Sequence, residues 1–415
     1  MNNLANNKSL FLGSCFALIT TGLTFSIRAG ILTQLGDDFN LSAEQLGFIN
    51  SMWFLGFPIS MILGGLFYYK IGAENIMRIA FITHTLGVIL TIMSQGYTLL
   101  LVSTLFIGFG NGCTEAACNP MIADIYSGKK MDKMLNRFHM WFPGGIVIGS
   151  LLSKFLTDFE VSWQSQMWLI MIPTIIYAVL FYGKQFPAPK KEEMISLNTN
   201  VKAMLSSTFI FLFLCMSLTS ITEFGPQQWI GIIMSHSGAS PMLILALVTG
   251  VMAVGRFFAG AIINKLGQEG VLLFSAIFST LGIYMFSMVT GGMAYVAALV
   301  FAIGVCYFWP TMIGVTAKRV PLSGALGLSV IGGVGMFSTS IFQPIIGRWI
   351  DSSQALVSEV SDMNVDINLL VGQITLGKLV VFPAILVVVF VIFFLYVKRQ
   401  NQQVDVSVNN SLKIK

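Results

Sequence analysis

The feature that most constrains this chain is a series of apolar runs, each long enough to cross a lipid bilayer as a helix. A transmembrane helix needs about 20 mostly apolar residues to span the hydrocarbon layer, which is about 30 Å thick. Twelve such runs occur in the 415 residues, at 9–35, 44–69, 76–95, 97–127, 136–158, 163–184, 204–234, 241–263, 269–291, 293–317, 323–349 and 370–397. They predict an all-α membrane protein that crosses the bilayer twelve times.

The composition favours a membrane protein and excludes several other classes. Hydrophobic residues make up 55% of the chain and charged residues 10%, whereas soluble domains carry about 25% charged residues. The sequence contains no nucleotide-binding loop, no nucleophile motif and no cysteine pair with metal-ligand spacing. We therefore expect neither an enzyme nor an ATP-driven pump, and no cofactor, metal or nucleic-acid partner.

The chain divides into two halves of six predicted helices. The most polar internal stretch, Lys184 to Lys202, separates the sixth apolar run from the seventh and contains prolines and clustered charges. Such a composition is typical of a linker between domains. We predict an N-terminal six-helix bundle at 1–184, a cytoplasmic linker at 185–203 and a C-terminal six-helix bundle at 204–415.

The two halves share a short loop motif at a constant spacing. The motif consists of Gly65, Lys70 and Gly72 after the second run, and of Gly260, Lys265 and Gly267 after the eighth. Each residue of the first copy is 195 positions before its equivalent in the second, as from 72 to 267. A constant offset is the pattern of a parallel internal repeat, so we expect two pseudo-symmetric bundles.

The basic residues predict the orientation of the chain. If the N-terminus is cytoplasmic, 18 lysines and arginines lie in segments on the cytoplasmic side and three lie on the other side. Cytoplasmic segments are enriched in basic residues. We therefore expect an integral protein of a bacterial inner (plasma) membrane, with both termini in the cytoplasm.

These features together resemble the major facilitator superfamily of transporters. Gly65, Lys70 and Gly72 match that family's loop pattern, whereas Tyr69, and Asn264 in the second copy, replace its aspartate. The resemblance implies a monomeric secondary transporter that moves a small solute through the lipid bilayer. Two halves would rock about a site near the midplane, with the motif residues taking part in gating.

A narrower resemblance lies in the fourth predicted helix. The run from Gly108 to Pro120, with Glu115 and Asn119, is similar to the fourth-helix signature of the fucose–proton symporter family, which carries a buried glutamate. That family also has a carboxylate in its first helix, where the only charge here is Arg28. This resemblance implies proton-coupled symport of a sugar or sugar derivative.

Three ionisable side chains within predicted helices mark the candidate site: Arg28, Glu115 and Glu223. A charge at a helix centre costs roughly 2.5–3.5 kcal/mol on insertion scales, so such residues indicate function. Glu115 shares a helix face with Asn111 and Asn119, four residues before and after it. We hypothesise that Glu115 carries the coupling proton and that one of the asparagines binds solute hydroxyls. A protonated glutamate with a purely structural role is the alternative.

Arg28 and Glu223 occupy equivalent positions of the first and seventh helices, since they are also 195 residues apart. In the resembled fold both helices line the central cavity, so the two charges are expected to pair across it. A solute carboxylate would open this pair by binding Arg28; a structural ion pair between the halves is the alternative. Gly225 and Pro226 are expected to interrupt the seventh helix. Further substrate-binding candidates are Gln227, Gln228, Trp229, Trp309 and Gln343.

Three functions remain open from the residues alone. The first is a proton-coupled symporter of a sugar or sugar derivative, with Glu115 as the proton carrier. The second is an exporter of organic anions or siderophore-like metabolites with the same fold. The third is a non-transporting sensor or a membrane-embedded enzyme, for which the chain offers no attached soluble domain and no nucleophile motif. Substrate-driven proton flux, and its direction, would separate the three.

Overall fold

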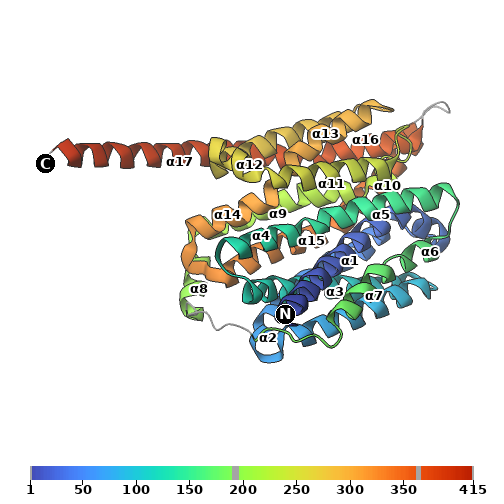
Figure 1. The fold of residues 1–415 in the computed structure, drawn as a ribbon. Helices are drawn as coiled ribbons and strands as arrows, with labels where there is room; N and C mark the ends of the chain where they lie inside the picture. Colours follow the sequence, from blue (N-terminus) through green and yellow to red (C-terminus); the bar gives the residue numbers. More distant parts are fainter. Residues whose placement is uncertain (1, 189–195, 361–365, 414–415) are drawn as a thin grey trace.

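The computed structural model describes residues 2–188, 196–360 and 366–413, and these ranges form a bundle of α-helices without a strand (Figure 1). The N-terminal part contains α1 (Asn2–Phe39), α2 (Ala43–Ile92), α3 (Tyr97–Ile125), α4 (Gly128–His139), α5 (Trp141–Asp158), α6 (Trp163–Trp168) and α7 (Met171–Phe181). The C-terminal part contains α8 (Leu197–Met204), α9 (Ser207–Gln228), α10 (Ile230–Ile233), α11 (Pro241–Phe257), α12 (Ala259–Phe286), α13 (Met293–Val305), α14 (Phe308–Arg319), the 3-10 turn η1 (Pro321–Ser323), α15 (Gly324–Val360), α16 (Ile367–Leu379) and α17 (Val381–Lys413).

The predicted spans correspond to these helices. Within the described residues, ten helices are long and apolar enough to cross a membrane. The shorter apolar helix α11, and a second crossing within the 50 residues of α2, account for the other two predicted spans. The all-α fold is thus confirmed. Of the predicted linker, residues 189–195 lie outside the described ranges and α8 occupies its end.

Gly72 and Gly267 adopt the same unusual backbone conformation. The φ and ψ angles are 73° and 162° at Gly72, and 72° and 163° at Gly267, where each glycine interrupts a long helix. A side chain is strained at such angles, so the turn requires glycine. Two equal turns 195 residues apart are what the internal repeat predicts.

The most extensive contacts between the halves are those of α2 with α15 and of α5 with α11, and α1 also contacts α9, α10 and α11. Helices α2 and α15 are antiparallel and approach closely at two glycines. A Cβ added to Gly47 would lie 2.5 Å from the Cα of Pro344, and one added to Gly347 would lie 2.1 Å from the carbonyl oxygen of Ala43. Small residues permit such close approach of helix backbones in membranes.

Polar contacts close the same interface at the end where α2 begins. The carboxylate of Asp351 accepts hydrogen bonds from the N–H groups of Ala43 (2.9 Å) and Glu44 (2.8 Å). Arg348 forms an ion pair with Glu44 at 2.6 Å. Farther along α2, Pro58 still lies 3.6 Å from a Cβ added to Gly333 of α15, whereas a Cβ added to Gly65 would have no neighbour within 4 Å. We call the group Ala43, Glu44, Arg348 and Asp351 the end latch.

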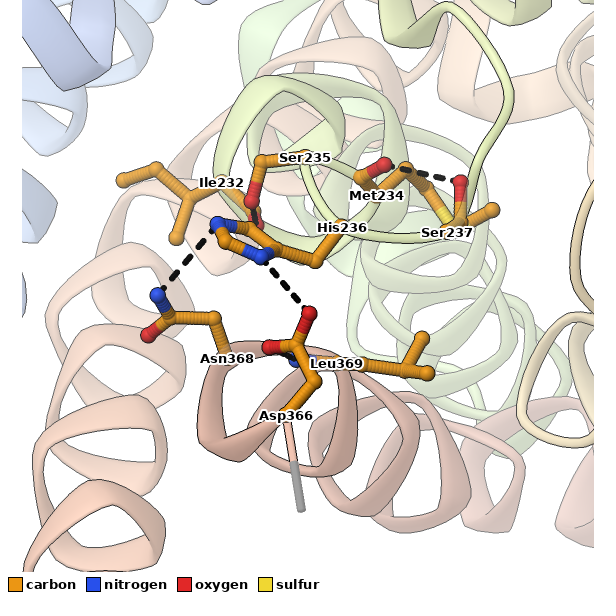
Figure 2. A network of polar contacts seen from close by, with 8 residues as sticks. All are labelled: Ile232, Met234, Ser235, His236, Ser237, Asp366, Asn368 and Leu369. Carbon is orange, nitrogen blue, oxygen red and sulfur yellow. Dashed lines mark hydrogen bonds and ion pairs between the residues drawn. The ribbon is translucent and has the colours of Figure 1, made fainter. Parts of the chain in front are cut away.

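A second polar network ties two segments of the C-terminal part together (Figure 2). His236, in the turn before α11, lies 2.9 Å from the carboxylate of Asp366 and 3.3 Å from the side-chain amide of Asn368 at the start of α16. Asp366 also caps α16 by accepting the N–H of Leu369 at 3.1 Å. The imidazole of His236 beside it holds the pKa of the Asp366 carboxyl below its ordinary value.

Candidate functional site

Arg28 lies buried at the contact between the two halves. Its Nε and Nη2 both donate to Oε1 of Gln228, at 3.2 and 2.5 Å. The Nε2 of Gln228 in turn donates to the carbonyl oxygen of Phe25 at 3.2 Å. The guanidinium lies over the rings of Trp53 and Phe54, at 5.1 and 5.9 Å from their centroids. Gln228 therefore joins α9 of the C-terminal part to α1.

The predicted pairing of Arg28 with Glu223 is wrong in this structure. Glu223 is buried and faces α11, where Arg256 Nη2 lies 3.3 Å from its Oε1. The reason is helical geometry: Gln228 follows Glu223 by five residues, and at 3.6 residues per turn their side chains point about 140° apart. When Gln228 faces α1, Glu223 cannot face it as well.

The predicted interruption of the seventh helix lies elsewhere. Helix α9 continues through Gly225 and Pro226 to Gln228, and the break falls at Trp229, between α9 and α10. Trp229 is completely buried, and Gln227 points to α11, where its amide lies 3.9 Å from the sulfur of Met252. The proline is accommodated within the helix, as is common in membrane helices.

A chain of aromatic rings crosses the middle of the molecule. Trp53 and Phe54 of α2 have ring centroids 4.9 Å apart, and Phe54 is 5.9 Å from Phe224 of α9. Phe224 is 6.0 Å from Trp309 of α14, and Phe25 of α1 contacts Phe224 at 5.8 Å. These rings come from both halves, and Arg28 lies against the end of the row formed by Trp53 and Phe54.

Asn111 belongs to a buried hydrogen-bond network inside the N-terminal part. Its Nδ2 donates to Oγ1 of Thr24 (3.1 Å), which also accepts from Trp53 Nε1 (3.1 Å). The Oδ1 of Asn111 therefore faces Nε2 of His84 (2.9 Å) as an acceptor, and the other ring nitrogen of His84 accepts from the hydroxyl of Tyr177 (3.1 Å). Every member is satisfied with a neutral histidine.

Sequence reasoning missed His84, although it is an ionisable residue within the third predicted span. The ring occupies space that Gly110 leaves free, because a Cβ at Gly110 would lie 2.4 Å from the ring. Glycine in the fourth-helix signature thus makes room for the network. The network holds Trp53, which lies beneath Arg28.

Glu115 and Asn119 lie apart from that network. Both are half-buried, and the Nδ2 of Asn119 donates to Oε2 of Glu115 at 2.5 Å. The expectation that Asn111, Glu115 and Asn119 form one polar face holds only for the last two, because Asn111 points to His84 and Thr24. The carboxyl of Glu115 is therefore bonded within its own helix.

Several buried polar atoms near the contact of the halves have no hydrogen-bond partner among the described residues. They are Arg28 Nη1, both polar atoms of the Asn50 and Gln343 amides, Ser220 Oγ, Glu223 Oε2, Trp229 Nε1 and Thr311 Oγ1. Burying such an atom unpaired costs about 1–3 kcal/mol, so native structures keep few of them without a reason. They come from α1, α2, α9, α14 and α15 and from the junction between α9 and α10.

The cavity beside Arg28 is small in this conformation. It has a volume of about 10 Å³ and is lined by the guanidinium, by Thr24, Thr91 and Thr104, and by apolar side chains. That space holds roughly one water molecule. Its lining residues all belong to the N-terminal part, and the space is too small for an organic solute.

The loop-motif residues lie around the two turns within α2 and α12. Gly72 and Gly267 make the two matched turns, and Lys70 lies with its ammonium 5.8 Å from the ring centroid of Phe67. Gly65 and Lys265 are exposed, and Gly260 lies within α12. Just after the second motif, Glu269 pairs with Arg319 at 2.6 Å.

Comparison with known proteins identifies the family. The model of the Major Facilitator Superfamily matches residues 14–342, most of the chain. The chain belongs to the Major Facilitator Superfamily. As a member of this superfamily, the protein is a transporter and not an enzyme, as predicted. The narrower resemblance to fucose–proton symporters stays a prediction.

Two curated relatives of this superfamily transporter are similar over most of their length. The cis,cis-muconate transport protein of Acinetobacter baylyi is 23% identical over 287 residues, covering 65% of this chain and 69% of the relative. The hexuronate transporter of Bacillus subtilis is 24% identical over 317 residues, covering 71% and 72%.

Solved structures share the fold of this superfamily transporter at low sequence identity. A variant of the nucleoside transporter NupG has a TM-score of 0.77 at 13% identity, covering 94% of this chain and all of that one. The D-xylose–proton symporter has a TM-score of 0.69 at 16% identity, covering 91% and 96%.

Proposed function

We propose that this transporter moves a small organic solute that carries a carboxylate, with sugar acids as the leading class, and couples this movement to protons. The observation that carries the proposal is the guanidinium of Arg28, which is buried and whose only hydrogen-bond partner among the described residues is a neutral amide oxygen. A buried charge without a counter-charge is costly in a membrane protein. A solute carboxylate would provide that counter-charge.

The chemistry of Arg28 fits a carboxylate. A guanidinium binds a carboxylate through two parallel N–H groups. The amide oxygen of Gln228 accepts from Nε and Nη2, while Nη1 has no hydrogen-bond partner in the described part of the chain. We infer that the solute replaces Gln228 on Arg28 when the halves separate. The names of the two curated relatives, which refer to muconate and hexuronate, support a carboxylate solute.

The remaining contacts suit a solute with hydroxyl groups. The side chains with unpaired polar atoms include Asn50 on α2, Ser220 on α9 and Gln343 on α15. Trp309 offers a flat ring face for a cyclic solute. Because these residues come from both halves, a solute bound among them would contact both halves at once.

Several further assignments belong to this proposal. Glu115, with Asn119 beside it, is the candidate proton carrier, and the two copies of the loop motif take part in gating. We place the protein as a monomer in a bacterial inner membrane with cytoplasmic termini. With this orientation the end latch faces outward, and we infer that a molecule closed at that end is inward-facing.

Counterflow into proteoliposomes tests the solute class. We expect labelled glucuronate to exchange in the wild type and in Arg78→Gln, which removes an exposed arginine on α2. Arg28→Gln should reduce exchange to the level of empty liposomes. Wild-type exchange of glucuronate by Arg28→Gln would contradict the proposal.

Proton coupling and direction are measured in the same vesicles with an internal pH dye. External glucuronate should acidify the interior if the protein is a symporter, and the signal should be absent in Glu115→Gln. An exporter of organic anions, the second candidate, would instead release preloaded glucuronate when the exterior is made acidic.

A further inference from the structure

Glu223 and Arg256 form an ion pair in the C-terminal part, away from Glu115. We propose that this pair is a second proton-binding site, at which Glu223 takes up and releases a proton during each transport cycle. The inference rests on the proposed function and extends it by assigning the second carboxyl. It is carried by the geometry of the pair and by the position of Glu223 on the helix that holds Arg28.

The pair is incompletely formed. Glu223 is 1% exposed, its Oε1 lies 3.3 Å from Arg256 Nη2, and its Oε2 has no hydrogen-bond partner within residues 2–188, 196–360 and 366–413. A second pair in this half, largely buried Glu269 with Arg319, is closed to 2.6 Å. A well-paired carboxylate is stabilised in its charged form. A carboxylate with one unpaired oxygen and one long contact is stabilised less, so it accepts a proton more readily.

Arg256 has a second hydrogen-bond partner besides Glu223. Its Nε donates to the carbonyl oxygen of Cys306 at 3.1 Å, which ties α11 to the end of α13. The other titratable groups beside the pair are the thiol of Cys306 and the hydroxyl of Tyr307, which donates to the carbonyl oxygen of Gly255 at 3.1 Å. When Glu223 becomes neutral, the guanidinium keeps a partner.

The two members of the pair differ in exposure. The side chain of Arg256 is 24% exposed and that of Glu223 is 2% exposed. From this partial exposure we infer that Glu223 exchanges its proton at the side of the pair where Arg256 lies. The step itself is simple: a proton adds to the carboxylate of Glu223, the ion pair opens, and the reverse step restores it.

The position of Glu223 links this proton to the solute. Glu223 lies on α9 five residues before Gln228, whose amide oxygen holds Arg28. A solute carboxylate at Arg28 and a negative charge on Glu223 oppose each other, so solute binding and protonation favour each other. Such reciprocity is the condition for coupling two ligands.

The first test separates exchange from coupled transport. Proteoliposomes would contain the wild type, Glu223→Gln, or the control Asp158→Asn, which alters an exposed carboxyl paired with Lys154. Glu223→Gln should exchange labelled glucuronate but lose glucuronate-driven acidification, while the control keeps both. Acidification per glucuronate equal to wild type in Glu223→Gln would overturn the inference.

The second test needs no solute, so it stands even if the proposed solute class fails. The infrared carbonyl band of a protonated carboxylic acid is followed in the solute-free protein during acidification. A titrating band should be present in the wild type, Glu115→Gln and Asp158→Asn, with one component missing in Glu223→Gln.

A third variant tests the assignment even if Glu223→Gln misfolds. Glu223→Asp keeps the carboxyl, so its band should remain but move in frequency. A band of unchanged frequency in Glu223→Asp would belong to another residue and would refute the assignment. Absence of glucuronate and muconate exchange in the wild type would refute the solute class alone.

Discussion

The carboxylate of Asp351 accepts a hydrogen bond from the backbone N–H of Glu44 at 2.8 Å, across the contact between the two halves of the transporter. The other oxygen of Asp351 accepts the N–H of Ala43 at 2.9 Å. A negative charge at the N-terminus of a helix is favourable because the first N–H groups there lack partners within the helix. Asp351 of α15 thus holds the beginning of α2 and keeps this end of the bundle closed.

Asp351→Asn should therefore weaken the closed state. The loss of the charged cap is expected to cost about 1 kcal/mol, which shifts the ratio of closed to open molecules by about fivefold. Spin labels at Leu41→Cys and Leu356→Cys would report the distance between the halves at this end. We expect a larger population at long distance, and none in the control Asp158→Asn. An unchanged distance distribution would show that the end latch does not control closure.

Gly347→Ala should prevent closure by steric conflict. An added Cβ would lie 2.1 Å from the carbonyl oxygen of Ala43, which is backbone and cannot move without separating the helices. Overpacking of this kind costs about 1–3 kcal/mol. The same spin-label pair should show the open population, whereas Gly377→Ala, where an added Cβ meets nothing within 4 Å, should match the wild type. Equal behaviour of the two variants would contradict the close contact.

The pair His236–Asp366 should make stability depend on pH (Figure 2). His236 and the capped N–H of Leu369 hold the pKa of Asp366 below its ordinary value. The stabilisation is therefore present above the unfolded pKa and is lost as pH falls through the lower, folded pKa. Asp366→Asn should lower the thermal midpoint at pH 7, and the difference from wild type should vanish in strong acid. A difference that persists unchanged at low pH would exclude the carboxylate as its source.

His84→Ala should destabilise the N-terminal part. Removal of the ring leaves the amide oxygen of Asn111 and the hydroxyl of Tyr177 without their partners, and also leaves a cavity beside Gly110. The expected loss is about 2–4 kcal/mol in the free energy of unfolding. Thermal unfolding of the purified protein, compared with His139→Ala at an exposed site, measures it. Similar midpoints for the two variants would argue against a structural network.

Much of the fold follows from local properties of the chain. The length and apolarity of each run predict a membrane-crossing helix, because lipid requires every backbone polar group to be bonded within its own segment. The constant offset between Gly72 and Gly267 predicts two equivalent turns, because both positions have a backbone that only glycine adopts without strain. These features depend on few residues and need no knowledge of neighbouring helices.

The partners of the buried polar groups depended on tertiary structure. Arg28 and Glu223 were correctly predicted to lie inside helices, yet Arg28 binds Gln228, and Glu223 faces Arg256. His84 meets Asn111 across 27 residues of sequence. Which side chains meet depends on the rotation of each helix about its axis, and that rotation is set by packing against helices distant in the chain. Hydropathy reveals that a residue is buried, but only the packed bundle decides what it contacts.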